Sequence, residues 1–235
     1  LPSPMTTLAQ SQLQAALRAA EDPDAPPAER AEMLMQIAMG LQQRPGTAQQ
    51  LLDAVRLYRR GLELAPVPAT LLRARLGARL ATALQALPDG GAESLEDALQ
   101  SLRESLPVLQ ARGRPEEAAE AQLNEGLLLQ ALAGCGRARL QDAIHAYQCA
   151  LRVFTREAWP QEFAILHNNL AIAYLAMPAT DERGKLREAL AVRSFEAVLE
   201  VVNLIDHPSE YAMVQNNLGN ALQSASSSHV LENLL

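Results

Sequence analysis

The sequence predicts an all-α chain in which about five antiparallel helix pairs stack one after another as an α-solenoid. Two observations support this fold class. Ala and Leu supply most of the apolar residues, and aromatic residues make up only 3% of the chain, a composition that favours helices over strands. The phrase His-Asn-Asn-Leu-Ala, which begins at His167, also returns 48 residues later as Gln-Asn-Asn-Leu-Gly from Gln215. Self-similarity at a period of about 20–50 residues is typical of stacked-repeat folds.

The second helix of each pair, here called the B helix, carries a recurring pattern of a small, a large and a small residue. Positions i, i+4 and i+7 share one helical face. The two small residues would let a neighbouring helix approach, and the large one would fill the gap. The first small residues are 44, 45 and 48 positions apart along the chain. The four copies are Ala54-Tyr58-Gly61, Ala98-Leu102-Ser105, Ala143-Tyr147-Ala150 and Ala191-Phe195-Val198.

The first helix of each pair, the A helix, aligns through one small residue, which is Gly40, Ala81, Gly126, Ala171 or Gly219. A glycine inside a helix costs about 1 kcal/mol relative to alanine, a cost that close packing of two backbones would explain. The distance from the B-helix alanine to the next A-helix small residue is nearly constant, at 27 or 28 positions. The distance from the A helix to its own B helix increases from 14 to 20. The A-to-B loops are therefore expected to lengthen toward the C-terminus.

Proline and glycine lie at the expected helix ends, because proline lacks the backbone donor and glycine permits left-handed turns. In chain order, the expected helices and the proline and glycine residues at their ends are 7–21, 28–44 before Pro45-Gly46, 47–65 before Pro66, 69–87 before Pro88, 94–112 between Gly91 and Gly113, 115–133 from Pro115, 138–157 after Gly134-Cys135-Gly136, 161–177 between Pro160 and Pro178, 184–206 before Pro208, and 209–224. A last helix is expected to begin near Ser228.

These helices divide into an N-terminal segment with a first helix, 1–27, and a repeat domain, 28–235. The expected units of the repeat domain are 28–66, 67–113, 114–160, 161–208 and an incomplete 209–235. Helical arrays need a polar cap over the last apolar face, and the sequence gives none. That face is expected to be covered by further chain or by another molecule, with self-association through the C-terminal end as one hypothesis.

The pattern Ala143-x3-Tyr147-x2-Ala150 resembles the second-helix core of the tetratricopeptide repeat, and the stretch 217–222 resembles its first-helix core. The resemblance covers about residues 30–235. It implies a right-handed superhelix whose concave groove, lined mainly by A helices, binds a protein or peptide. The period of 44–48 residues exceeds the standard period of about 34 and looks like that of the long repeats in bacterial arrays.

The resemblance also implies which residues face the groove. They are Asn168, Ile172 and Leu175 in one unit, Asn216, Asn220 and Gln223 in the next, and Leu123, Leu127 and Gln130 in the preceding one. Side-chain amides both donate and accept hydrogen bonds, which suits an extended peptide backbone. Alternatively, some of these asparagines bridge adjacent A helices within the array.

Composition and motifs argue against several other functions. The net charge of −7 and the lack of a cluster of basic residues argue against nucleic-acid binding. No signal peptide and no apolar stretch of about 20 residues is present, so no membrane helix is expected. No catalytic, cofactor-binding or metal-binding pattern is found, and the four histidines are expected at the surface or at helix caps. Cys135 and Cys149 are expected to be reduced, which favours a cytoplasmic location.

The sequence therefore predicts a non-enzymatic scaffold or adaptor that binds a protein or peptide in the concave groove of a helical repeat array. Two alternatives remain open. The chain could be a sensor or regulatory repeat region of a larger signalling or protease protein. It could also be a helical protein that handles a small molecule or cofactor.

Overall fold

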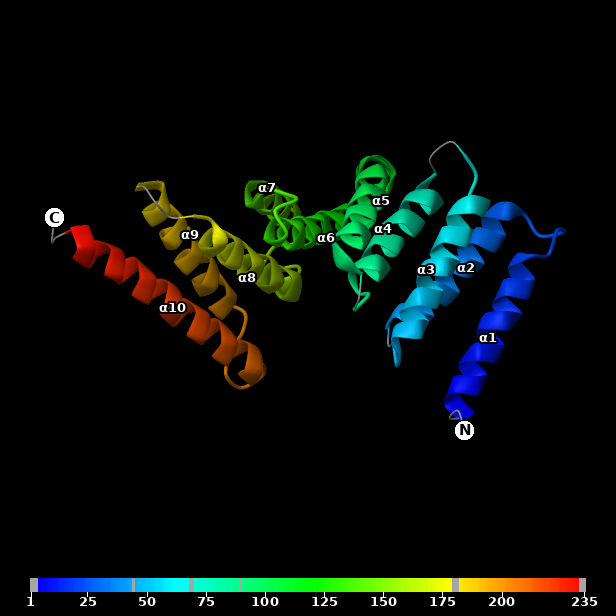
Figure 1. Cartoon of the computed structure of the whole chain (residues 1–235), viewed down its shortest axis with the longest axis horizontal. Helices are drawn as coiled ribbons and strands as arrows, with labels where there is room; N and C mark the ends of the chain where they lie inside the picture. The colour runs from blue at the N-terminus through cyan, green and yellow to red at the C-terminus, as the bar shows by residue number, and fades with distance from the viewer. Residues whose placement is uncertain (1–3, 44, 68–69, 89, 179–181, 233–235) are drawn as a thin grey trace. The chain divides into compact units, whose positions relative to one another are not determined.

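The computed structural model describes residues 4–43, 45–67, 70–88, 90–178 and 182–232. Within these ranges the chain forms ten α-helices and no strand (Figure 1), so the all-α prediction is confirmed for the described residues. The helices are α1 (Pro4–Ala20), α2 (Pro27–Gln43), α3 (Ala48–Leu64), α4 (Leu71–Gln85), α5 (Gly91–Arg112), α6 (Pro115–Gly134), α7 (Leu140–Ala150), α8 (Pro160–Ala176), α9 (Glu182–Leu199) and α10 (Pro208–Glu232).

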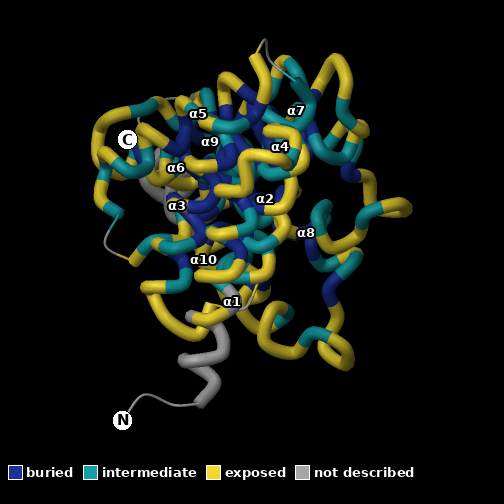
Figure 2. Tube along the Cα trace, turned by 90° about the vertical axis from the view of Figure 1, so that its right-hand side faces the viewer, coloured by how far each residue is buried: buried dark blue, intermediate teal, exposed yellow. Residues whose placement is uncertain are grey.

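The helices belong to two compact bodies, an N-terminal body up to Ala121 and a C-terminal body from Gln122, with the boundary inside α6. In the N-terminal body, α1 packs on α2, α2 on α3, α3 on α4 and α4 on α5. In the C-terminal body, α7 packs on α8, α8 on α9 and α9 on α10. Most helices that pack together thus follow one another in sequence, and α2 also contacts α4. Buried positions lie along the helices, and exposed positions follow most of the connections (Figure 2).

The A helices, which are α2, α4, α6, α8 and α10, begin at a nearly regular period. Their first residues are Pro27, Leu71, Pro115, Pro160 and Pro208, so successive starts lie 44, 44, 45 and 48 residues apart. Proline is favoured in the first turn of a helix, where its missing N–H would have no partner in any case. Four of these five helices begin with proline. The start of the A helix is therefore the most regular feature of the repeat.

Several connections between the helices include residues outside the described ranges. Of the A-to-B connections, only 135–139, between α6 and α7, is described throughout, so the expected lengthening of these loops toward the C-terminus lies outside the described residues. The first alanine of the B-helix pattern is residue 4 of α7 but residue 10 of α9, so part of the longer spacing lies within α9. The B-to-A connections described throughout are 113–114, 151–159 and 200–207, and they differ in length.

Two B helices end earlier than the sequence predicts. α7 ends at Ala150 and not at residue 157, and α9 ends at Leu199 and not at residue 206. After α9, Oδ1 of Asn203 accepts hydrogen bonds from the backbone N–H groups of Ile205 and Asp206, both at 2.9 Å. Such local side-chain bonds offer the backbone an alternative to helix. These bonds account for the early end of α9. Pro208 does not, because it lies five residues after Asn203.

The predicted break before Ser228 is also wrong, because α10 runs without interruption from Pro208 to Glu232. The serines at 226–228 carry a modest propensity penalty, but the segment contains no glycine or proline after Gly219. Serine costs far less in a helix than proline does. A run of serines therefore does not end the helix.

The large residues of the B-helix pattern form the centre of each helix pair. Tyr58, Leu102, Tyr147 and Phe195 are at most 1% exposed, and we call them the plug positions. The facing small residues of the A helices, called the seat positions, are Ala38, Ala81, Gly126 and Ala171. All four are buried. The expected assignment of Gly40 to this set is not met, since Gly40 is exposed and a Cβ there would meet nothing within 4 Å. The expected assignment of Gly219 is not tested, because no B helix follows α10 among the described residues.

A hydrogen bond fixes the register that places Ala38, rather than Gly40, in the seat. The hydroxyl of Tyr58 donates to Oε1 of Gln42 at 2.8 Å. The hydroxyl of Tyr147 donates to Oε1 of Gln130 at the same distance. In each case the glutamine lies one helical turn after the seat residue. The two tyrosine–glutamine pairs therefore define equivalent positions in helix pairs that are far apart in sequence.

Candidate partner-binding surface

The A helix α8 exposes three large apolar residues. Ile165 is 48% exposed, Ile172 is 36% exposed and Leu175 is 38% exposed. Ile165 and Ile172 are seven residues apart and so share one face of the helix. Leu166 and Leu170 are buried on another side of α8, as the hydrophobic composition of this helix requires. Apolar side chains therefore remain on the solvent side after the core has been filled.

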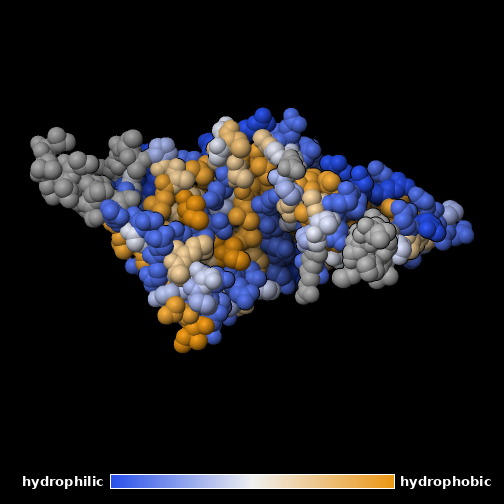
Figure 3. Space-filling view, turned by 60° about the horizontal axis from the view of Figure 1, so that its bottom comes forward, coloured by the Kyte–Doolittle hydropathy of each residue, from blue (hydrophilic) through white to orange (hydrophobic). Residues whose placement is uncertain are grey.

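The equivalent face of α10 continues this surface within the C-terminal body. Met213, which lies 48 residues after Ile165, is 49% exposed. Leu222 is 50% exposed, but it lies nine residues after Met213 and therefore on the opposite side of the helix. Asn216 and Asn220 are also exposed. Figure 3 shows exposed hydrophobic residues on the C-terminal body, in the left half of the view. The sequence therefore places an exposed apolar side chain at the same position of two successive A helices, with exposed asparagines beside it on α10.

Asn168 differs from the other predicted groove residues. It lies between Ala164 and Ala171, which belong to the hydrophobic cluster that α8 shares with Phe195 of α9. The Asn168 side chain is half-buried, and its Oδ1 atom is inaccessible and has no hydrogen-bond partner among the described residues. Its neighbour Asn169 donates from Nδ2 to the carbonyl oxygen of Ile165 at 2.9 Å. The register of α8 thus turns Asn168 toward α9 more than toward solvent.

The predicted groove residues of α6 are less accessible than those of α8. Leu123, Leu127 and Gln130 are each half-buried. Gln130 accepts the hydroxyl proton of Tyr147, so one of its amide atoms is part of the bond that joins α6 to α7. The expected alternative concerns asparagines that bridge adjacent A helices, whereas this bond joins an A helix to its own B helix through a glutamine.

One small cavity brings two predicted groove residues together. Leu175 of α8 and Asn220 of α10 both line a cavity of about 220 Å³. The remaining lining residues are Tyr174, Met177, Gly184, Arg187, Glu188 and Ala221. Small-molecule sites usually measure about 300–1,000 Å³. This cavity is better matched to a single side chain of a docked peptide than to a cofactor.

His167 contributes to the packing of α8 rather than to its exposed face. Its ring lies 4.3 Å from that of Phe163, centroid to centroid, at an interplanar angle of 54°. Its Nδ1 atom is inaccessible and has no hydrogen-bond partner in the described part of the chain. Burial lowers the pKa of His167 below its ordinary value, because the charged imidazolium is poorly solvated there. The negative charge of Glu200 partly opposes this effect.

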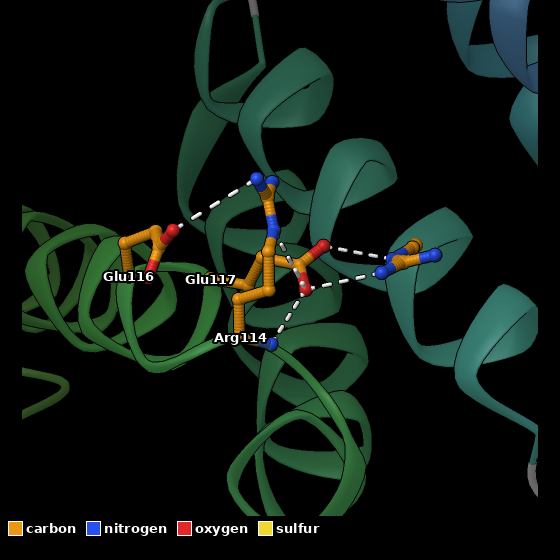
Figure 4. Close-up of polar contacts among 4 residues, drawn as sticks. Arg114, Glu116 and Glu117 are labelled. Atoms are coloured by element: carbon orange, nitrogen blue, oxygen red, sulfur yellow. Dashed lines mark hydrogen bonds and ion pairs between the residues drawn. The ribbon is translucent and has the colours of Figure 1, made fainter.

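A charged network in the N-terminal body escapes sequence analysis. Arg75 of α4 donates to Glu117 of α6 through Nε–Oε1 at 2.7 Å and Nη2–Oε2 at 3.2 Å. Glu117 also accepts the backbone N–H of Arg114 at 2.9 Å, as a residue in the first turn of a helix often does. Figure 4 shows this carboxylate between Arg114 and the arginine of the neighbouring helix. These contacts lower the pKa of Glu117, with the hydrogen bond from Arg75 as the largest cause.

The described residues contain no group of three or more His, Cys, Asp or Glu side chains placed to hold a metal ion. The sequence interpretation found no histidine four residues from a cysteine, which is wrong: His145 and Cys149 lie one turn apart on α7, and Sγ is 3.6 Å from Nε2. Two ligands on one helix do not complete a zinc site, which needs three or four. Both cysteines are free thiols.

Among the residues that the structure describes, every helix is too short or too polar to cross a bilayer. The sequence matches no model of a known protein family and no curated protein.

Proposed function

We propose that this chain is a right-handed, tetratricopeptide-like solenoid of about five helix pairs that acts as a non-enzymatic scaffold. It binds a protein or peptide segment along the exposed faces of α8 and α10. The observation that supports this most is the recurrence of exposed apolar residues at one register position, with Ile165 on α8 and Met213 on α10, 48 residues apart. The proposal includes a cytoplasmic location, which the two free thiols favour.

The mechanism follows from the chemistry of this surface. Ile165, Ile172 and Met213 would contact apolar side chains of the partner and supply most of the binding energy by burial. Asn216 and Asn220 would exchange hydrogen bonds with the partner's backbone, since each amide both donates and accepts. Fully buried apolar anchors surrounded by polar contacts are the usual arrangement of a peptide-binding surface.

Site-specific photo-crosslinking tests the proposal. A photoreactive phenylalanine analogue at Ile172 and another at Met213 should capture the same partner from a lysate of the source cells. The analogue at exposed Gln141 of α7 is the matched control. Substitution Ile165→Glu in the crosslinking chain should abolish the adducts, because it places an unpaired charge in the apolar contact. Adducts that appear equally from Gln141, or that survive Ile165→Glu, would exclude this surface.

A further inference from the structure

The outer side of α7 carries a thiol and an imidazole that contact each other. Cys149 lies four residues after His145, so the two side chains share one face of the helix, and Sγ is 3.6 Å from Nε2. His145 is exposed and Cys149 is half-buried. The opposite side of α7 is in the core, where Ala143, Tyr147 and Ala150 are fully buried. The pair therefore lies at the edge of the packing of α7, where a reagent in solution can reach the sulfur.

We propose that Cys149 is a modification site that forms a mixed disulfide with a small disulfide from solution, with His145 as the base. In the tautomer that carries its own proton on Nδ1, the Nε2 atom of His145 accepts the proton of the thiol. A thiol within reach of a base is the arrangement that activates sulfur as a nucleophile. The substrate class is a low-molecular-weight disulfide, which approaches a half-buried sulfur more easily than the disulfide of a folded protein does. The site lies on α7 and not on the exposed faces of α8 and α10, so this inference goes beyond the proposed function and does not depend on it.

The reaction balances without a further reactant. As Nε2 takes the thiol proton, the electron pair on Sγ attacks one sulfur of the small disulfide. A new S–S bond to Cys149 forms, the S–S bond of the reagent breaks, and the departing sulfur leaves with the electron pair as a thiolate. The imidazolium then returns its proton, directly or through water, to this thiolate. Cys149 is oxidised, the released half of the reagent is reduced to a thiol, and His145 ends neutral as it began.

The position of Cys149 near the end of α7 explains why the histidine matters. Cys149 is the second-last residue of the helix, which ends at Ala150. The last turn of a helix presents backbone carbonyl groups, which accept hydrogen bonds and do not donate them. A sulfur anion at this end of the helix therefore has no help from backbone N–H groups. Proton transfer to His145 creates an Nε2–H group, with a positive charge, at contact distance from that sulfur.

The second cysteine provides a comparison within the same chain. Cys135 is exposed and lies in the turn between Gly134 and Gly136, whereas Cys149 is half-buried. No histidine lies within nine residues of Cys135 along the chain, and its backbone N–H bonds to the carbonyl oxygen of Leu132 at 3.1 Å. Access alone therefore predicts that Cys135 reacts first. Proton transfer to a neighbouring histidine predicts the reverse order.

Reaction with oxidised glutathione tests the proposal. The chain is incubated with an excess of this reagent at neutral pH and quenched at a series of times, and peptide mass spectrometry gives the fraction of each cysteine in a mixed disulfide. Cys149 should react about tenfold faster than Cys135. This is less than the hundredfold or more that a base contributes in an enzyme site, because the pair is open to water. The rate at Cys135 in the same sample corrects for reagent concentration and for any unfolding.

Substitution of the histidine identifies the base. His145→Gln should lower the rate at Cys149 about tenfold and leave the rate at Cys135 unchanged. Gln148→Ala is the matched control and should leave both rates as in the wild type, because Gln148 adjoins Cys149 in sequence and is exposed but bonds to the hydroxyl of Tyr174. Circular dichroism confirms that both variants remain helical.

Three outcomes would overturn the proposal. The first is a wild-type chain in which Cys135 reacts before Cys149. The second is a His145→Gln variant in which Cys149 keeps its wild-type rate. The third is an equal slowing of Cys149 by Gln148→Ala, which would assign the effect to the local structure of α7 and not to a base.

Discussion

The phenol ring of Tyr147 lies against the backbone of Gly126, where no side chain larger than hydrogen can fit without displacing the ring. The tyrosine is fully buried, and its hydroxyl is held by Gln130. The ring is therefore fixed at both ends and cannot yield easily. This contact makes the glycine at position 126 a packing requirement of the α6–α7 pair.

Gly126→Ala should destabilise the chain by about 1–3 kcal/mol, the usual cost of overpacking. That cost should exceed the gain of up to about 1 kcal/mol from replacing a helical glycine by alanine. Gly40→Ala, at an exposed position with free space, should show only the gain. Urea denaturation followed by circular dichroism measures both. A Gly126→Ala variant as stable as Gly40→Ala would contradict the close packing.

Tyr58→Phe should cost about 1 kcal/mol at neutral pH, because it leaves Oε1 of Gln42 without its donor. Gln42 also donates to Oγ1 of Thr82 at 2.9 Å, so the tyrosine is part of a chain of bonds from α3 through α2 to α4. Tyr211→Phe is the control. The Tyr211 hydroxyl accepts from the exposed Gln215, and its loss should change the free energy of unfolding by less than about 0.5 kcal/mol.

The same tyrosine predicts an alkaline dependence. Burial raises the pKa of Tyr58 to about 12 from its ordinary value of 10.0. Above pH 10 the unfolded chain loses this proton before the folded chain does, so stability falls as the pH rises toward 12. Chemical denaturation from pH 9 upward should show a shallower fall in Tyr58→Phe than in the wild type. An unchanged slope would exclude Tyr58 as a source of the alkaline loss.

Glu117→Gln should weaken the N-terminal body and remove part of its sensitivity to acid. The folded-state pKa of Glu117 lies below its ordinary value of 4.5, so its contribution is present above pH 4.5 and is lost as the pH falls through the folded-state pKa. The Arg75 side chain is 39% exposed, so water weakens this ion pair. The pair should contribute about 1 kcal/mol to the free energy of unfolding. Glu116→Gln is the control, since its partner Arg114 is 3.8 Å away and 69% exposed. Equal acid profiles for the two variants would contradict the assignment.

His167→Phe should reduce the loss of stability in mild acid. Burial lowers the folded-state pKa of His167, so below pH 6.5 the unfolded chain takes up a proton more readily than the folded chain. Stability therefore falls as the pH drops below 6.5. Phenylalanine fills the space beside Phe163 and does not titrate. Thermal unfolding between pH 7 and pH 5 should show a smaller decrease in Tm for the variant, and an equal decrease would remove His167 from the explanation.

The helices could be placed from sequence because their determinants are local. A proline in the first turn and the spacing of small and large residues lie within one helix, so no knowledge of the fold is needed. The end of α9 could not be placed, because it depends on bonds from the Asn203 side chain to Ile205 and Asp206. The pattern of hydrophobic residues does not show whether such side-chain bonds will replace the backbone hydrogen bonds of the helix.

The candidate surface was predicted less well than the helices. Ile172, Leu175 and Asn220 are exposed as expected, because their register on the A helices follows from the repeat. Asn168 is turned toward α9, since a shift of one or two residues around a helix changes which neighbour a side chain meets. The pairing of Arg75 with Glu117 spans 42 residues and has no local signature at all.

In the C-terminal body α10 packs on α9 and α9 packs on α8, and this order has a consequence for how these helices open. In such an array, a terminal helix can detach without disturbing the next pair, so opening proceeds inward one helix at a time. Amide hydrogens of α10 should therefore exchange with solvent faster than those of α9, and those of α9 faster than those of α8.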